Sequence, residues 1–168
     1  MACHEGVRVM KIEKIVSGGQ TGADRAALDF ALRYRIPYGG WVPKGRKTED
    51  GRLPKRYNLQ EMPSPHYSQR TRQNVIDSDG TVIFSHGFLT GGSLLTKNFA
   101  RRYEKPCLHL DMAQTSIETA ARQLNRWIED HRLKTLNVAG PRAGRDSRIY
   151  HVTMTVLETT FCVKDQKE

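Results

Sequence analysis

The segment that most constrains the fold of this chain is the strand, glycine turn and helix read from Lys11 to Tyr34. Ile12, Ile15 and Val16 are apolar and β-branched, which is typical of a short buried strand. Small and flexible residues then interrupt the strand: Ser17, Gly18, Gly19 and Gly22. Apolar residues follow at helical spacing: Ala27, Phe30, Ala31 and Tyr34. The pattern predicts a helix that begins near Thr21 directly after a glycine turn.

Two interpretations of this glycine turn are open from the sequence. In the first, Thr21 and Asp24 form a capping box, and the glycines only make a tight connection. In the second, Gly18, Gly19 and Gly22 let a phosphate approach backbone N–H groups at the positive end of the helix. The spacing matches neither G-x-G-x-x-G nor G-x-x-x-x-G-K-[ST], so neither standard nucleotide-binding motif applies.

The rest of the chain continues to alternate between strand and helix patterns. Apolar, β-branched runs predict strands at 36–42, 80–84, 106–110 and 134–138. Helices are expected at 68–77, capped by Ser68, at 91–103, and at 115–131, where Thr115 and Glu118 suggest a capping box. The segment 147–162 fits both periods, and we expect a helix because the alternation continues that way. The prediction is an α/β chain forming a single Rossmann-like, doubly wound domain, with a mostly parallel sheet of about five strands and helices on both faces.

Three glycine turns fall at the carboxyl ends of the predicted strands. The second lies in 85–93 and begins a helix with Gly91, Gly92 and Ser93, whose N–H groups suit an oxyanion, unless Thr90 caps that helix. The third is 139–144. In doubly wound sheets, ligands bind beyond the carboxyl ends of the strands, so the three turns together predict a site at that edge.

Five segments of this chain resemble the putative molybdenum carrier family: 17–24 (SGGQTGAD), 40–46 (GWVPKGR), 78–84 (SDGTVIF), 90–93 (TGGS) and 136–141 (LNVAGP). That family is similar to a Rossmann-like superfamily that includes lysine decarboxylase-like, cytokinin-activating proteins and DNA-processing protein A. The resemblance extends over about 11–161. It implies a Rossmann-like fold and a pocket, the molybdenum cofactor or a nucleotide as ligand, and a homo-oligomer, either dimer or tetramer. The cytokinin-activating relatives carry Pro-Gly-Gly-x-Gly-Thr and then a catalytic glutamate, whereas here the third glycine is missing and Lys97 and Asn98 stand where the acid is expected.

The candidate ligand-binding residues come from the turns and from nearby basic positions. They are Gly18, Gly19, Thr21, Gly22, Asp24, Arg25, Lys44, Arg46, Arg70, Gly91, Gly92, Ser93 and Thr96. No catalytic residue is assigned, and nothing in the sequence requires an enzyme. Cys107 and His109 would share one face of a strand, but a metal site needs more ligands, so we expect core packing and no metal bound directly by the protein.

Composition narrows the partners and the compartment. The 168 residues suit one domain, expected over 11–162 with a loose leader at 1–10 and a tail at 163–168. Lys and Arg total 27 and Asp and Glu total 18, so the formal charge is +9 and favours anionic partners. The three cysteines lie far apart without a Cys-x-x-Cys pair, and no apolar run is long enough to span a membrane, so we expect a reducing cytoplasm and no membrane partner.

The polar segment 43–65 is rich in proline, glycine and charge and shows no period. We expect a long irregular loop, mobile without ligand, whose Lys44 and Arg46 settle over a bound anion.

Three functions are open from the sequence. The first is binding of an anionic phosphorylated small molecule. The second is hydrolysis of a nucleotide or nucleoside phosphate, with Asp24 as the acid or base. The third is binding of single-stranded DNA, which is disfavoured because aromatic residues make up only 8% of the chain and are scattered.

Overall fold

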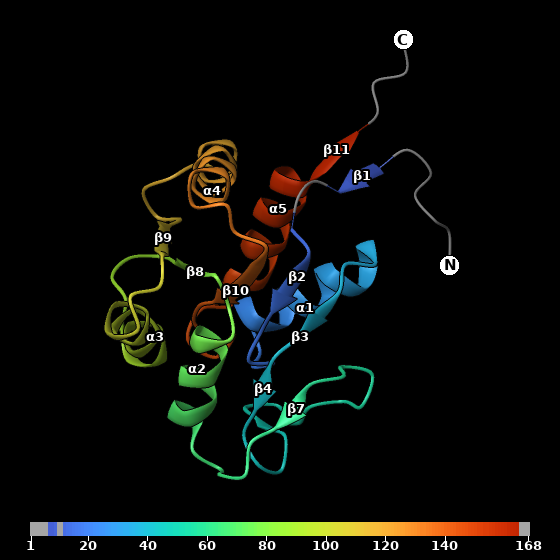
Figure 1. Cartoon of the computed structure of the whole chain (residues 1–168), viewed down its shortest axis with the longest axis vertical. Coiled ribbons are helices and arrows are strands. Elements are labelled where there is room, and N and C mark those ends of the chain that lie inside the picture. The colour runs from blue at the N-terminus through green and yellow to red at the C-terminus, as the bar shows by residue number, and fades with distance from the viewer. Residues whose placement is uncertain (1–6, 10–11, 165–168) are drawn as a thin grey trace.

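A central parallel sheet of five strands organises the fold. The structure is a computed structural model that describes residues 7–9 and 12–164. The strand order is β3 (Tyr38–Gly39), β2 (Lys14–Val16), β10 (Thr135–Ala139), β8 (Gly80–Ser85) and β9 (Cys107–Asp111) (Figure 1). All four pairings are parallel. The predicted α/β fold class is confirmed.

Five helices within the described residues cover both faces of this sheet. They are α1 (Ala23–Tyr34), α2 (Tyr67–Ile76), α3 (Gly91–Arg102), α4 (Ile117–His131) and α5 (Ile149–Phe161). The β2–α1–β3 and β9–α4–β10 crossovers run in one direction along the sheet, and the β8–α3–β9 crossover runs in the other. Because such crossovers are right-handed, α1 and α4 lie on one face of the sheet and α3 lies on the other. The packing agrees, because α5 contacts both α1 and α4, while α2 contacts α3 (Figure 1).

The main core fills the space between the sheet and α1, α4 and α5. Ile15, Leu136 and Phe84 from the strands meet Phe30 and Leu124 from the helices, all fully buried. Every residue of β8 is buried, as expected for a strand covered on both faces. The segment 147–162, whose pattern fits both a strand and a helix, forms α5 and contributes to this core. The expected helix is confirmed.

The change of crossover direction places the switch point of the sheet around β10, between β2 and β8. The loops that leave the carboxyl ends of these three strands are the three glycine turns. A Rossmann-like sheet opens a crevice at such a point, because neighbouring loops depart toward opposite faces.

The ends of the described chain pair with each other. β1 (Val7–Val9) forms an antiparallel ribbon with β11 (Cys162–Lys164). Part of the expected loose leader and of the expected tail is thus a two-stranded ribbon; residues 1–6, 10–11 and 165–168 lie outside the described residues.

The segment 43–65 differs from the expected irregular loop because it has its own small core. It contains the hairpin of β5 (Lys47–Thr48) and β6 (Gly51–Arg52), and β7 (Gln60–Glu61), which pairs with β4 (Trp41–Val42). Leu53, Tyr57 and Leu59 are buried against Val42 and Leu28 of α1. The expectation of a long irregular loop is therefore wrong.

Arg46 secures this segment from within. Its guanidinium donates hydrogen bonds to the carbonyl oxygens of four residues at 2.7–3.3 Å: Leu53, Pro54, Tyr57 and Leu59. Because these N–H donors bond to carbonyl oxygens of its own loop, the Arg46 guanidinium is not available to bind a ligand. The expected role of Arg46 in a lid is therefore not supported.

We expect Arg46→Met to destabilise the protein by about 2 kcal/mol, because charged hydrogen bonds to a loop backbone are lost while the apolar stem is retained. Urea unfolding of this variant, compared with Lys44→Met at the exposed neighbouring cation, measures the effect. Equal midpoints for the two variants would show that the four bonds contribute nothing.

Two helix starts differ in detail from the sequence interpretation. Ser116, not Thr115, caps α4 and accepts a hydrogen bond from the Thr119 N–H at 3.2 Å. Ser68 lies inside α2, which begins at Tyr67 after His66. Among the described residues, no helix has the length and apolar character needed to cross a membrane.

Candidate functional site

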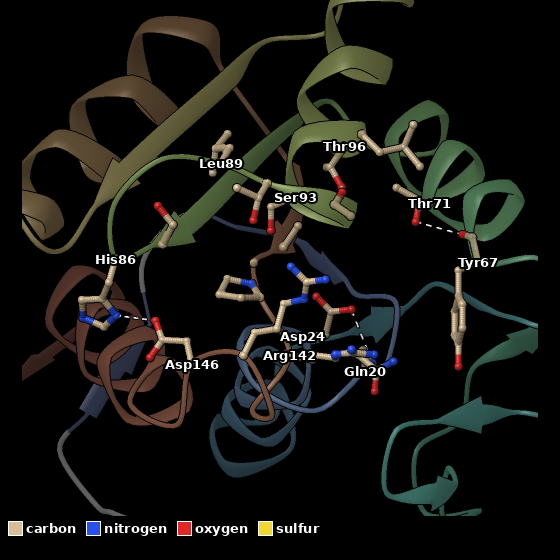
Figure 2. A pocket seen from close by; sticks show the side chains of 18 of the residues that line it. Gln20, Asp24, Tyr67, Thr71, His86, Leu89, Ser93, Thr96, Arg142 and Asp146 are labelled. Atoms are coloured by element: carbon tan, nitrogen blue, oxygen red, sulfur yellow. Dashed lines mark hydrogen bonds and ion pairs between the residues drawn. The ribbon is translucent and has the colours of Figure 1, made fainter.

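A cavity of about 620 Å³ opens at the carboxyl edge of the sheet, at the switch point (Figure 2). Its lining comes from the β2–α1 turn, α2, the loop after β8, α3 and the turn after β10. The site predicted from the convergence of three glycine turns therefore coincides with a real cavity.

The first glycine turn is shaped by close backbone packing. Gly22 has φ +81°, and a Cβ there would lie 2.3 Å from the Pro141 carbonyl oxygen. Thr21 Oγ1 accepts a hydrogen bond from the Ala143 N–H at 3.1 Å, and Gly22 is the residue that precedes α1. The capping box of Thr21 and Asp24 is therefore wrong, because the Thr21 side chain joins the turn after β2 to the turn after β10.

Asp24 and Arg70 form a buried ion pair in the cavity wall. Arg70 Nη1 lies 3.4 Å from Asp24 Oδ2, and the side chains are 12% and 6% exposed. Gly18 makes room for it, because a Cβ there would lie 1.9 Å from Arg70 Nη1. Among the described residues, the buried Arg70 Nε–H has no hydrogen bond partner.

Burial raises the pKa of Asp24 from 3.8 to about 6, although Arg70, the Gln20 N–H and Arg25 all act to lower it. Removal from water disfavours the carboxylate more than these partners favour it. Asp24 is thus a carboxyl group that can hold or release a proton close to neutral pH.

The start of α3 forms a second part of the wall. Gly92, Ser93 and Thr96 line the cavity, and Figure 2 shows the Ser93 and Thr96 side chains above it. Within the described chain, the Thr90 side chain makes no hydrogen bond to the helix start, so the alternative interpretation of a threonine cap is wrong. The first N–H groups of a helix carry partial positive charge, which suits an anion here.

The turn after β10 supplies most of the positive charge. Arg142, Arg145 and Arg148 line the cavity with Arg70 of α2. Of the described lining residues, these four arginines face two carboxylates, Asp24 and Asp146, so the formal balance is 4 − 2 = +2. This glycine turn is visible in the sequence, but none of its arginines is among the predicted binding residues.

His86 and Asp146 pair at one side of the cavity, where Figure 2 shows them pointing toward each other. His86 Nδ1 lies 2.5 Å from Asp146 Oδ2, and each side chain is 13% exposed. His86 follows β8 directly and Asp146 precedes α5, so the pairing spans 60 positions and no local sequence motif indicates it.

Ser85, which lines the cavity, forms a second pair with His109 of β9. Ser85 Oγ lies 2.6 Å from the Gly87 carbonyl oxygen and 2.7 Å from His109 Nε2. The Ser85 hydroxyl has one proton, and it donates this proton to the Gly87 carbonyl oxygen, which can only accept. Ser85 Oγ therefore accepts its second hydrogen bond from His109 Nε2–H. Burial lowers the pKa of His109, which agrees with a neutral ring. The pair is structural, since His109 cannot take the serine proton in this arrangement.

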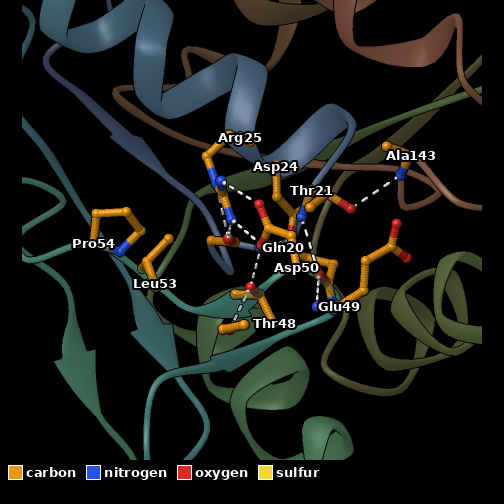
Figure 3. A network of polar contacts seen from close by, with 12 residues as sticks. Gln20, Thr21, Asp24, Arg25, Thr48, Glu49, Asp50, Leu53, Pro54 and Ala143 are labelled. Atoms are coloured by element: carbon orange, nitrogen blue, oxygen red, sulfur yellow. Dashed lines mark hydrogen bonds and ion pairs between the residues drawn. The ribbon is translucent and has the colours of Figure 1, made fainter.

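A polar network behind the first turn accounts for several predicted residues (Figure 3). Arg25 donates to the Gly19 carbonyl oxygen at 3.3 Å and pairs with Asp50 at 3.2 Å. Glu49, at the tip of the β5–β6 hairpin, accepts a hydrogen bond from the Gly144 N–H at 2.6 Å and pairs with Arg142 at 3.1 Å. The network joins the first turn, the hairpin and the β10 turn into one rim.

The predicted site residues therefore divide into three groups. Those that line the cavity are Asp24, Arg70, Gly92, Ser93 and Thr96. A second group lies in the turns beside it: Gly18, Gly22 and Gly91 lie against lining residues, Thr21 bonds Ala143, and Gly19 packs toward Leu53. The third group, Arg25, Lys44 and Arg46, does not line the cavity. The sequence carries one indication of the cavity arginines that were not predicted. Arg142, Arg145 and Arg148 recur every three residues after the glycine that follows a strand.

A directly bound metal has no ligand set in the described part of the chain, because no three His, Cys, Asp or Glu side chains there are grouped to hold an ion. A cavity ligand would be held by arginines, hydroxyls and backbone N–H groups.

Comparison with known proteins identifies the family. Residues 15–161 match the Circularly permutated YpsA SLOG family. The crystal structure, at 1.45 Å resolution, of a putative molybdenum carrier protein from Syntrophus aciditrophicus SB has 60% sequence identity to this chain and a TM-score of 0.88. The similarity covers 92% of this chain and 96% of that one. No curated protein matches the chain. The resemblance to the molybdenum carrier proteins is confirmed, and the chain belongs to the circularly permutated YpsA SLOG family.

Proposed function

We propose that this protein binds a small phosphorylated anion in the cavity at the carboxyl edge of the sheet. The molybdenum cofactor is the first candidate and a nucleotide the second. The observation that supports this most strongly is the convergence of four arginines from two separate elements on one cavity that also contains the start of α3. Arginine and a helix N-terminus are the two groups best suited to bind phosphate oxygens.

The dimensions and rim of the cavity support a ligand of this size. About 620 Å³ lies within the range of pockets that enclose a cofactor-sized molecule. Phe88 lines the rim with its side chain 97% exposed, so a flat pterin or base has an aromatic partner there. In the molybdenum cofactor the organic part carries both the metal and the phosphate ester, so the protein needs to hold only the organic part.

The name of the relative from Syntrophus aciditrophicus supports the first candidate, because that protein is described as a putative molybdenum carrier and is 60% identical to this one. Native mass spectrometry of gently purified protein tests which ligand is carried. We expect an added mass that matches a phosphorylated pterin or nucleotide.

Titration calorimetry with 5′-AMP and adenosine tests the phosphate requirement. The two probes share a base and a sugar, so their difference isolates the phosphate. We expect 5′-AMP to bind at least about 30-fold more tightly, or about 2 kcal/mol. Equal affinities would contradict an anion site.

Glu49 competes with a bound anion for one of these arginines. Its carboxylate accepts a hydrogen bond from the Gly144 N–H and pairs with the guanidinium of Arg142, which lines the cavity. We expect Glu49→Gln to bind 5′-AMP about 5-fold more tightly, because a neutral amide competes less well for Arg142.

Asp50→Asn is the matched control for that variant. Asp50 lies on the same hairpin tip but pairs with Arg25, away from the cavity. If both variants change the affinity for 5′-AMP equally, the effect reflects net charge and not release of Arg142.

A further inference from the structure

Asp24 and Arg70 present an incompletely bonded ion pair to the cavity, which both residues line. Arg70 Nη1 lies 3.4 Å from Asp24 Oδ2, and the Gln20 N–H reaches the same oxygen at 3.4 Å. Hydrogen bonds between a guanidinium and a carboxylate are usually about 2.7–2.9 Å long. Both members of the pair therefore keep capacity for further hydrogen bonds.

The second carboxylate oxygen of Asp24 is open to the cavity. Asp24 Oδ1 accepts no hydrogen bond from any described residue, because both contacts of this carboxylate are made by Oδ2. The described side-chain atoms that are buried without a partner are Arg70 Nε and Thr153 Oγ1. Asp24 Oδ1 is not among these atoms, and neither is Arg70 Nη2, so solvent reaches both and a ligand in the cavity can bond to them.

The positive charge that remains for a phosphate lies elsewhere in the cavity. Two of the four cavity arginines have a carboxylate partner, whereas Arg145 and Arg148 form no ion pair within the described part of the chain. A Cβ added to Gly91 would lie 3.8 Å from Arg145 Nη1, so this guanidinium stands beside the first residue of α3. Figure 2 shows Asp146, which lies between these two arginines in the chain, apart from Asp24. A phosphate is attracted to Arg145 and the helix start, and the Asp24 carboxylate repels it.

The groups that Asp24 and Arg70 leave open match one kind of ring edge. Guanine and pterin each carry a carbonyl, a ring N–H and an amino group in a row on one six-membered ring. The two nitrogens can donate to the Asp24 carboxylate, and the carbonyl can accept from the Arg70 guanidinium. The order agrees, because Oδ2 is the carboxylate oxygen next to Arg70. Adenine has an unprotonated ring nitrogen in the middle position, which a carboxylate disfavours.

The pair opposes stability, which favours a functional reason for it. Burial raises the pKa of Asp24 to about 6, so an ionised Asp24 destabilises the fold at neutral pH. The Arg70 Nε–H is buried without a partner, which also opposes folding. Titratable groups in such unfavourable environments cluster at functional sites.

We propose that Asp24 and Arg70 select the ring of the bound molecule, and that this ring is a 2-amino-4-oxopyrimidine, the part that guanine and pterin share. The proposal rests on the phosphate binding proposed above and specifies the other part of the same ligand. Asp24 accepts hydrogen bonds from the ring N–H and the amino group, and Arg70 donates to the carbonyl. Adenine nucleotides bind mainly through their phosphate and therefore more weakly.

Calorimetry with 5′-GMP, 5′-IMP and 5′-AMP tests the ring preference at pH 8, where Asp24, whose pKa is about 6, is ionised. The three probes share a sugar and a phosphate, so the ratios of their affinities isolate the ring. We expect 5′-GMP to bind about 10-fold more tightly than 5′-IMP, which lacks only the amino group. We expect it to bind about 30-fold more tightly than 5′-AMP.

Asp24→Asn should reduce both ratios to about twofold, because one amide oxygen replaces the two carboxylate oxygens and the charge is lost. Asp50→Asn is the matched control, since it removes a carboxylate that pairs with Arg25 outside the cavity. It should keep the wild-type ratios. Neopterin monophosphate carries the same ring edge on a pterin and should lose as much affinity as 5′-GMP in Asp24→Asn. Whichever of these two binds wild type more tightly identifies the source of the ring.

The outcomes separate this proposal from the phosphate site. Equal affinities of wild type for the three nucleotides, all tighter than for adenosine, overturn the ring selection and leave the phosphate site standing. Wild-type ratios that persist in Asp24→Asn overturn the role of Asp24. Absence of binding for every probe overturns the two proposals together.

Discussion

Gly92→Asp is expected to abolish binding of phosphorylated ligands while leaving the fold intact. No described atom lies within 4 Å of a Cβ added at Gly92, so the side chain enters open space. A carboxylate also suits the positive end of α3, so the helix is not weakened. The new charge occupies the place of the phosphate and repels it, and we expect an affinity loss of at least about 100-fold, or about 2.7 kcal/mol.

Gly92→Asn separates charge from shape in this experiment. The amide has nearly the same size but no charge, so it should retain much more of the 5′-AMP affinity than the aspartate. Calorimetry at two salt concentrations measures both, and the difference between the variants should shrink as salt screens the repulsion. If Gly92→Asp binds 5′-AMP as tightly as wild type, the glycine turn before α3 is only structural.

Asp24→Asn is expected to stabilise the protein by about 3 kcal/mol at pH 8. The folded protein raises the pKa of Asp24 from 3.8 to about 6, mainly through burial, so ionisation is costly in the folded state. The contacts with Arg70 and the Gln20 N–H already oppose that rise and are included in it. Asparagine imitates the protonated acid and avoids the cost of the buried charge.

The direction of the pH effect follows from the raised pKa. As pH falls from about 6 to about 4, folded Asp24 takes up its proton before the unfolded chain does, so wild type gains stability and the advantage of Asp24→Asn shrinks. Urea unfolding at pH 8 and pH 4.5 should show a loss of about 2 kcal/mol in that advantage.

Asp50→Asn provides a control of opposite sign. Hydrogen bonds from Thr48 and Arg25 lower the pKa of Asp50, so its charge stabilises the folded protein at neutral pH. That variant should be less stable than wild type at pH 8. An Asp24→Asn variant that is also less stable than wild type at both pH values would show that the Arg70 pair stabilises the fold more than burial of the carboxylate opposes it.

Patterns that repeat along the chain predicted the fold correctly. The alternation of β-branched strands with amphipathic helices predicts a layered α/β arrangement, and the glycine turns mark where β2, β8 and β10 end. Because parallel strands place those ends at one edge, the position of the cavity also followed from the sequence. Five of the residues predicted to bind a ligand line this cavity, and each lies in or beside a turn or a helix start: Asp24, Arg70, Gly92, Ser93 and Thr96.

The residues that sequence reasoning misplaced depend on contacts between distant segments. Thr21 looks like a cap but contacts Ala143 across 122 positions. Arg46 looks like a free cation, yet its donors go to carbonyl oxygens that point inward only after Leu53 and Tyr57 are buried. His86 acquires its partner only when the loops after β8 and β10 meet. Such pairings have no periodic signal, because tertiary packing alone creates them.

The ribbon of β1 and β11 has a consequence for how proteins of this architecture can be rearranged during evolution. It holds Val7–Val9 beside Cys162–Lys164, so both ends of the described chain leave the domain at one place. A gene fusion that joins two such neighbouring ends and opens the chain in a surface loop leaves every strand of the central sheet with the same neighbours. The cavity, which is built from three turns and from α2 and α3, would survive such a reordering because none of its lining residues lies in the ribbon.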